Sequence, residues 1–356
     1  MLFFFGAAAV DHRLALAAIL FILPLSFIAS AFIAHWSYSL PARIFYFCST
    51  LWLGVGLTLL MAFSLAWVAW GTGHVFAGGS NPRPYGVIAV ALALLYSAYG
   101  IWNAYHPRLV NCTVRIPNLP PEWQGKTIVH ISDVHLGSVL GAEFLTGVVE
   151  KVNAQNPAMV LITGDLFDGS DGKLEQLVAP INRIGAPQGT YFVTGNHETY
   201  LGVQRSFVAL RGTPVKILDD EMAVVKGLQV VGISYPERGH ALAFAAKMAK
   251  VNGFNPAAPS ILLYHSPTQI KEAKAAGINL QLSGHVHQGQ LFPLGFITRL
   301  MFGKYHHGLH AEGNYTIYTS SGTGLWGPTM RTGNHPEIVV IKLESGDRSQ
   351  EVESQA

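Results

Sequence analysis

Charged residues are almost absent from the first 105 positions of this chain, and their absence constrains the fold more than any other feature. Asp11, Arg13, Arg43 and Arg83 are the only Asp, Glu, Lys or Arg residues there, whereas the remainder carries acids and bases in equal number. Charged residues make up 12% of the whole chain, against about a quarter in ordinary soluble proteins. The sequence therefore predicts two parts with different surroundings.

Three apolar stretches in the first part are long enough to cross a bilayer as helices, which takes about 20 residues each. They cover residues 14–34, 44–70 and 85–105, and none contains a charged side chain. Trp and Tyr residues lie near their ends, where aromatic rings favour the headgroup zone. We therefore expect residues 1–105 to form an all-α transmembrane anchor of about three helices. A cleaved signal peptide would explain one such stretch but not three.

The basic residues bear on orientation and on partners. With three spans, Arg13 and Arg83 share one side of the membrane, and four basic residues share the other side with the C-terminal part. Because basic loops tend to remain cytoplasmic, we expect a multi-pass protein of the cell (inner) membrane with a cytoplasmic C-terminal part. The net charge of +2 gives no reason to expect a nucleic-acid partner. The anchor also lacks the intramembrane ionisable cluster that is typical of transporters.

The second part alternates short apolar runs with helical patterns. Strands are expected at 127–132, 159–163, 190–194, 223–225, 228–234, 261–264, 280–283, 315–319 and 337–343. Helices are expected at 143–153, 172–183, 199–210, 241–251 and 268–275. This alternation predicts one α/β domain over residues 125–345. Residues 106–124 are expected to form a linker and entry segment, and residues 346–356 a polar tail.

Polar side chains follow five of the predicted strands at the point where each strand ends. They lie in Ser132–His135, Gly164–Asp168, Gly195–Glu198, His265 and Gly284–His287. Ligands bind at the carboxyl ends of strands in open α/β sheets, so we expect these side chains to converge. Carboxylates, an amide and imidazoles without thiolates suit Mn, Fe, Zn or Mg. Each motif is weak by itself, but the ordered set predicts a site for two divalent ions.

The same ordered set resembles the calcineurin-like metallophosphoesterase superfamily across about residues 120–345. The matching motifs are Asp-x-His, Gly-Asp-x-x-Asp, Gly-Asn-His-Glu, His and Gly-His-x-His. Segments 289–293, 321–324 and 336–338 further resemble its membrane-attached bacterial branch, which lies near the enzymes that cleave UDP-2,3-diacylglucosamine. The resemblance implies a four-layer α/β/β/α metallophosphoesterase sandwich preceded by the transmembrane helices.

The resemblance also implies a role for each matching residue. The implied ligands are Asp133, His135 and His287 for one ion, Asn196, His265 and His285 for the other, and Asp165 as a bridge between them. A hydroxide between the ions would attack phosphorus, and His197 would act as general acid. Glu198 could hold the imidazole of His197, or it could be an acid favoured at a helix N-terminus. Asp168 could orient a ligand or serve local structure.

One apolar segment outside these motifs has two interpretations. Residues 291–302 are too apolar for an ordinary exposed loop. The segment could belong to the core. It could also dock on the membrane and admit a lipid tail, with Arg299 and Lys304 facing the headgroups.

These observations predict a membrane-anchored hydrolase of a phosphoester or pyrophosphate bond. A lipid or lipid precursor such as UDP-diacylglucosamine is the expected substrate, because a soluble substrate would not require three spans. One alternative is a phosphodiesterase that acts on soluble substrates and is merely tethered to the membrane. The other is a non-catalytic membrane signalling or scaffold protein. The superfamily's substrates are too varied for the fold to choose among them.

Overall fold

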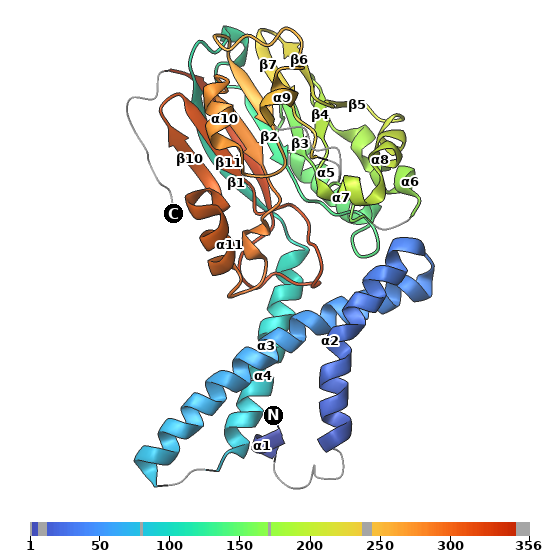
Figure 1. The fold of residues 1–356 in the computed structure, drawn as a ribbon, viewed down its shortest axis with the longest axis vertical. Coiled ribbons are helices and arrows are strands. Elements are labelled where there is room, and N and C mark those ends of the chain that lie inside the picture. Colours follow the sequence, from blue (N-terminus) through green and yellow to red (C-terminus); the bar gives the residue numbers. More distant parts are fainter. Residues whose placement is uncertain (1, 6–12, 79–80, 170–171, 237–243, 347–356) are drawn as a thin grey trace. The chain divides into compact units, whose positions relative to one another are not determined.

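A computed structural model of the chain shows two compact units, each described here by itself (Figure 1). The residues that the structure describes are 2–5, 13–78, 81–169, 172–236 and 244–346. The first unit comprises residues 1–104 together with the short segment 327–332, and the second comprises the rest. The division after Ala104 lies next to the point where the charge content of the sequence changes.

The first unit is helical. Its helices are α1 (Leu2–Phe5), α2 (Arg13–Trp36), α3 (Leu40–Ala77) and α4 (Arg83–Ala104). By length and composition, α3 and α4 could cross a membrane, over Leu40–Phe76 and Arg83–Ala104. The apolar part of α2 whose side chains are described, Ile22–Trp36, is shorter. The first part of the first predicted span, residues 14–21, therefore lies where the structure describes no side chains.

Small residues let α3 and α4 approach each other closely. The buried residues of α4 are Gly86, Ala89, Ala93, Ser97, Gly100, Asn103 and Ala104. The Thr58 and Ser97 hydroxyls are 2.7 Å apart, an interhelical polar contact of the kind that stabilises apolar helix pairs. The segment 327–332 packs on the same two helices, because the Met330 side chain fills the space beside Gly54. The Arg331 N–H also donates to the Gly100 carbonyl at 2.9 Å.

The second unit contains two six-stranded sheets. The first sheet has the order β1 (Arg108–Ile116), β12 (Glu337–Ser345), β2 (Thr127–Ile131), β3 (Met159–Thr163), β4 (Thr190–Val193) and β5 (Val215–Ile217). The second has the order β10 (Gly308–Glu312), β11 (Tyr315–Thr319), β9 (Leu280–Ser283), β8 (Ser260–Leu263), β7 (Leu228–Gly232) and β6 (Glu221–Val225). Strands β2 to β5 are parallel, as are β7, β8, β9 and β11. Each sheet therefore collects the carboxyl ends of its central strands at one edge.

Helices cover the outer faces of both sheets (Figure 1). The helical elements of this unit are α5 (Ala142–Asn153), α6 (Leu174–Val178), α7 (Asn196–Leu201), α8 (Val203–Leu210), α9 (Phe244–Met248), α10 (Ile270–Ala275) and α11 (Gly295–Phe302), with short 3₁₀ turns at Pro121–Trp123, Ala179–Arg183, His287–Gly289 and Gly303–His306. One apolar core lies between α5, α6, α8 and the first sheet, a second lies between the sheets, and a third lies under α9 and α10. These layers confirm the predicted α/β/β/α sandwich.

Two local features differ from the sequence predictions. Residues 108–116, expected within a linker, form β1 and pair in parallel with the whole of β12, so that part of the linker assignment is wrong. The alternating residues Val114 and Ile116 point into the core between the sheets, a period-2 pattern that the linker assignment overlooked. The helix expected over 199–210 is interrupted at Gly202, whose φ of 97° is incompatible with a helix. The start of the helix expected at 241–251, and the tail beyond residue 346, lie outside the described residues.

Candidate metal centre

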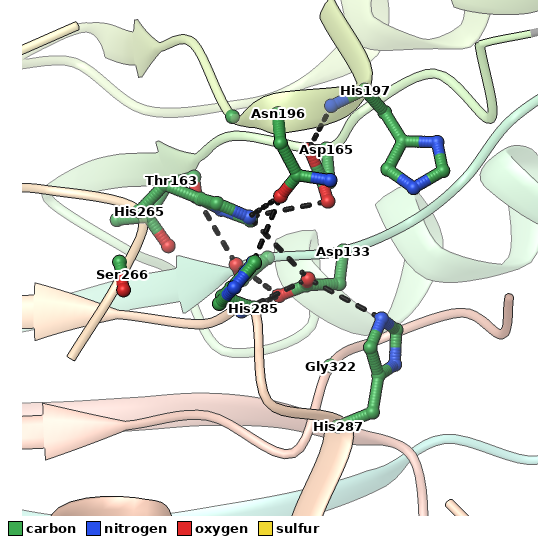
Figure 2. A network of polar contacts seen from close by, with 12 residues as sticks. Asp133, Thr163, Asp165, Asn196, His197, His265, Ser266, His285, His287 and Gly322 are labelled. Carbon is green, nitrogen blue, oxygen red and sulfur yellow. Dashed lines mark hydrogen bonds and ion pairs between the residues drawn. The ribbon is translucent and has the colours of Figure 1, made fainter. Parts of the chain in front are cut away.

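The predicted ligands lie just beyond the carboxyl ends of five strands, three from the first sheet and two from the second. Asp133 and His135 follow β2, Asp165 follows β3, Asn196 begins α7 after β4, His265 follows β8, and His285 and His287 follow β9. Figure 2 shows six of these side chains turned toward one another, those of Asp133, Asp165, Asn196, His265, His285 and His287. The parallel strands of each sheet bring them to one edge, and the packing of the two sheets brings both edges together.

Asp133, His135 and His287 form the first group of candidate ligands, with one ligand atom from each within 4.8 Å of the others. The Nε2 atoms of His135 and His287 are 3.0 Å apart, and Nε2 of His287 is 3.4 Å from Oδ1 of Asp133. The Asp133 carboxylate also accepts a hydrogen bond from the His285 N–H, at 3.0 and 3.1 Å to its two oxygens. The Asp133 carboxylate, which follows β2, is therefore also held by the end of β9, the strand that supplies His287.

Asp165, His265 and His285 form the second group, by the same 4.8 Å criterion. Nε2 of His265 is 3.1 Å from Oδ2 of Asp165. Nδ1 of His265 donates to the Thr163 carbonyl at 2.7 Å, which turns Nε2 toward the group. The amide oxygen of Asn196 is 2.8 Å from Nδ1 of His285 and 3.2 Å from Nε2 of His265 (Figure 2).

A third combination joins the two groups. Ligand atoms of His135, Asp165 and His197 also lie within 4.8 Å of one another. Asp165 thus belongs to more than one cluster and stands between the predicted sets, where the sequence analysis expects a bridging ligand. The seven expected ligands occupy one cluster, in which every residue except the half-buried His285 is buried.

The electrostatics of this cluster favour added positive charge. Burial alone would lower the pKa of His265, but attraction to Asp165 and Asp133 outweighs it and raises that pKa to about 10. Burial likewise disfavours ionised Asp165, yet His265 and His197 hold its pKa well below the ordinary range. Burial raises the pKa of Asp133 to about 6. Two carboxylates in a low-dielectric site are stabilised by cations, and carboxylate, amide and imidazole donors fit Mn, Fe, Zn or Mg.

The backbone at the ligands is strained. Asp133, His135, Asp165, His285 and His287 have φ values of 52°, 54°, 49°, 73° and 49°. Positive φ is uncommon for residues with a side chain, although Asp and His tolerate it better than most. Such conformations cost about 1–3 kcal/mol each and persist where the surroundings impose them. Their concentration at the strand ends marks this edge as a functional site.

Glycines leave the space that the ligands occupy. A Cβ at Gly284 would lie 2.0 Å from Oδ2 of Asp133, and a Cβ at Gly195 would lie 2.2 Å from Oδ1 of Asp165. Gly195 directly precedes Asn196 in the sequence, and Gly284 directly precedes His285. The glycines of the Gly-Asn-His and Gly-His-x-His motifs are therefore required by close approach to the carboxylates.

His197 lies beside the ligands and has its own orienting partner. Its ring is 4.6 Å from that of His135, and its Nδ1 is 2.7 Å from the carbonyl oxygen of Asp168. Nδ1 therefore carries the proton that this carbonyl accepts, and Nε2 is the atom left for chemistry. The Asp168 carboxylate accepts the Ser138 N–H at 2.7 Å, so Asp168 contributes through its backbone to His197 and through its side chain to local structure.

Glu198 does not hold the His197 imidazole, and this corrects one of the two roles that the sequence left open. Its carboxylate accepts hydrogen bonds from the N–H groups of Gly195 at 2.7 Å, Asp165 at 2.9 Å and Phe167 at 3.2 Å. Burial, reinforced by Asp165, raises the pKa of Glu198 to about 7. Glu198 is thus a clamp between the β3 and β4 strand ends and a positioning residue, not one that faces the cluster.

Two aromatic residues beside His197 were missed by the sequence analysis. The Trp326 ring is 5.7 Å from the His197 ring, and the Tyr200 ring is 5.2 Å from it. Each is nearly half exposed, at 46% and 47%. Trp326 lies in the glycine-rich stretch 322–327. Nothing local indicated its neighbour, because 129 positions separate the two residues.

Two adjoining groups of buried carboxylate and imidazole ligands, at the strand ends of an α/β/β/α sandwich, define a metal-dependent hydrolase. A family model described as calcineurin-like phosphoesterase matches residues 126–289, the stretch from β2 through the His287 turn. This match, together with a relative that is 35% identical and covered over 68% of its length, shows that the chain belongs to the calcineurin-like phosphoesterase family, whose members use two divalent metals. The chain is a metal-dependent phosphoester hydrolase.

Several relatives extend this match over most of the chain. An uncharacterized metallophosphoesterase of Campylobacter jejuni is 35% identical over 265 residues, covering 72% of this chain and 68% of its own length. A Bos taurus protein named transmembrane protein with metallophosphoesterase domain is 33% identical over 305 residues, 78% of this chain and 67% of that protein. An uncharacterized metallophosphoesterase of Aquifex aeolicus is 30% identical over 259 residues, 71% of this chain and 98% of that protein.

Proposed function

We propose that the chain is a membrane-anchored phosphoesterase that uses two divalent ions to hydrolyse a phosphoester or pyrophosphate bond of a lipid or lipid precursor, such as UDP-diacylglucosamine. The single observation that carries the hydrolytic part is the convergence of two ligand groups on Asp165. An intact ligand set argues against the non-catalytic scaffold, since a scaffold has no need of buried, strained metal ligands.

The proposal assigns metal binding to seven residues and proton donation to His197. One ion would be held by Asp133, His135 and His287, the other by Asn196, His265 and His285, with Asp165 in contact with both. When bound, two such ions lower the pKa of a water molecule and stabilise negative charge on the phosphoryl oxygens. His197 would hold a proton at Nε2 for the departing oxygen, because its Nδ1 donates to the Asp168 carbonyl.

The membrane part of the proposal rests on the helical unit. Two helices, α3 and α4, are long and apolar enough to span a bilayer, and a relative carries the word transmembrane in its name. A hydrolase anchored to the membrane by such helices would have direct access to lipid substrates. We further propose an inner-membrane location with the hydrolase in the cytoplasm, from the count of basic residues over three spans. Protease protection in right-side-out and inverted vesicles tests this orientation.

Hydrolysis by the full-length protein in detergent, supplied with Mn²⁺, tests the catalytic proposal. Bis-p-nitrophenyl phosphate, p-nitrophenyl phosphate and UDP-diacylglucosamine would be compared side by side. Asp165→Ala should abolish turnover, and His197→Ala should lower it by about 10²–10⁴-fold. His310→Ala, which replaces a histidine on β10, should retain it. The lipid assignment fails if soluble esters are hydrolysed far better than any lipid, in detergent and in vesicles alike. Absence of bound metal would favour the scaffold.

A further inference from the structure

Helix α11 carries an apolar surface that the described residues of its own unit leave uncovered. Phe296, Ile297, Leu300 and Met301 are exposed, at 68%, 53%, 87% and 70%, and none of the residues of α11 is buried. These four positions follow the i, i+4 spacing that places side chains on one face of a helix. Helix α11 is therefore not part of the core, although Leu291 at the start of the segment 291–302 is buried. For the helix, only the external interpretation remains.

The apolar surface extends beyond the helix toward its preceding turn. Phe292 and Leu294 are also exposed, at 47% and 37%, and the Phe292 ring lies 6.1 Å from that of Phe296. Contiguous exposed apolar residues on this scale mark a surface that binds a partner or a membrane.

The charges near α11 identify the kind of partner. Arg299 and Lys304 are exposed, and the sequence contains no Asp or Glu between Glu272 and Glu312. Glu312 pairs with Lys274 and Lys304 at 2.6 Å each, so a net positive charge remains. Apolar side chains flanked by cations match the acyl and phosphate layers of an anionic bilayer. A symmetric contact between two copies of the chain would instead bring these like charges together.

The same helix is joined to the last predicted ligand by a short segment and ends beside another. It starts eight residues after His287, and a Cβ at Gly289 would lie 2.4 Å from the Gly295 nitrogen, which shows how tightly the two segments pack. At its other end, the Phe302 ring lies 6.4 Å from the ring of His285. The apolar end of α11 therefore lies next to a predicted ligand.

We propose that α11 lies in the interfacial layer of an anionic lipid bilayer and forms the route by which the acyl part of a lipid substrate reaches the metal centre. The substrate route rests on the proposed function, whereas the insertion of α11 into the bilayer does not. Insertion of α11 is a physical property of this helix and can be measured without turnover.

The test uses full-length protein in which Cys48 and Cys112 are replaced by Ser. A single cysteine is introduced by Leu300→Cys or, as the matched control, by Val224→Cys. Val224 is 63% exposed and lies on β6, at the opposite edge of the same sheet from β10. Each protein is labelled with the fluorophore NBD and reconstituted into phosphatidylcholine–phosphatidylglycerol vesicles, with and without brominated acyl chains.

Brominated lipid is expected to quench NBD at position 300 at least about threefold more than at position 224, because interfacial helices bury their apolar face about 5–10 Å into the acyl boundary. Equal quenching at both positions would overturn the proposal. So would efficient disulfide cross-linking between two chains at position 300, which would assign the face to a second copy. The Val224→Cys protein verifies that the cysteine-free background folds.

Turnover then separates this proposal from the proposed function. In vesicles, Leu300→Asp should lower the ratio of lipid to p-nitrophenyl ester hydrolysis about tenfold, the cost of placing a charge in the interfacial layer, while Val224→Asp should leave it unchanged. An unchanged ratio in Leu300→Asp refutes the substrate route even if α11 inserts. If the wild-type protein hydrolyses no ester, the proposed function fails, and the quenching result still decides where α11 lies.

Discussion

Gly284→Ala tests whether the metal centre depends on the space that glycine leaves beside Asp133. The added Cβ would lie 2.0 Å from Oδ2 of Asp133 and 2.0 Å from Oγ of Ser132, about 1.3 Å inside a normal carbon–oxygen contact. Asp133 and Ser132 are both fully buried, so neither can swing into solvent. The carboxylate must therefore move away from the cluster, and it then loses the hydrogen bond that the His285 N–H donates to it.

The expected cost follows from these contacts. Overpacking costs about 1–3 kcal/mol, and loss of a hydrogen bond to a charged acceptor adds about 1.5–3 kcal/mol. A sum near 4 kcal/mol corresponds to a fall in melting temperature of roughly 10 °C for a unit of this size. Displacement of a ligand by about 1 Å should lower turnover roughly a hundredfold.

Three measurements on detergent-purified protein check this prediction: thermal unfolding, bound metal per chain, and hydrolysis of bis-p-nitrophenyl phosphate. Gly147→Ala is the matched control, because Gly147 lies in α5 with nothing within 4 Å of its added Cβ. Alanine in a helix interior should stabilise by about 0.5–1 kcal/mol. The reasoning is refuted if Gly284→Ala keeps its metal, its melting temperature and its activity.

Three further predictions concern residues around the same centre. His197→Ala should lower kcat by about 10²–10⁴-fold with unchanged metal content; loss of metal would instead make His197 a ligand. Glu198→Ala leaves three buried N–H groups without their acceptor and should cost about 3 kcal/mol or more; an unaltered melting temperature with lost activity would restore a catalytic role. His130, in β2, is buried, and burial lowers its pKa to about 3. Below pH 6.5 the unfolded chain therefore binds a proton that the folded chain does not. The free energy of unfolding should therefore decrease as the pH is lowered below 6.5, by about 2 kcal/mol at pH 5. His130→Gln should flatten the melting temperature between pH 5 and 6.5, and a persistent slope would show that another group carries it.

The strands that supply the centre were predictable because their signals are local. Met159–Thr163 and Leu280–Ser283 are fully buried runs with turn residues directly behind them, and the structure begins and ends both strands at the predicted residues. By contrast, β1 carries only a half-buried alternation, which acquires meaning when β12, more than 200 positions away, pairs with it. The sequence analysis also missed the short edge strands β5 and β10, because their local patterns acquire meaning only when the neighbouring strand pairs with them.

The chemistry of the site could be predicted from the ordered motifs, because consecutive residues show both the type of each donor and its position at a strand end. The roles inside the site depend on contacts between distant segments. Only packing brings Trp326 to His197, turns the Glu198 carboxylate toward three backbone N–H groups, and makes the Asp168 carbonyl the partner of His197. Packing also leaves α11 on the surface, although its composition resembles that of a core segment. Residue identity determines which groups can bind metal or lipid, and long-range contacts determine which of them are free to do so.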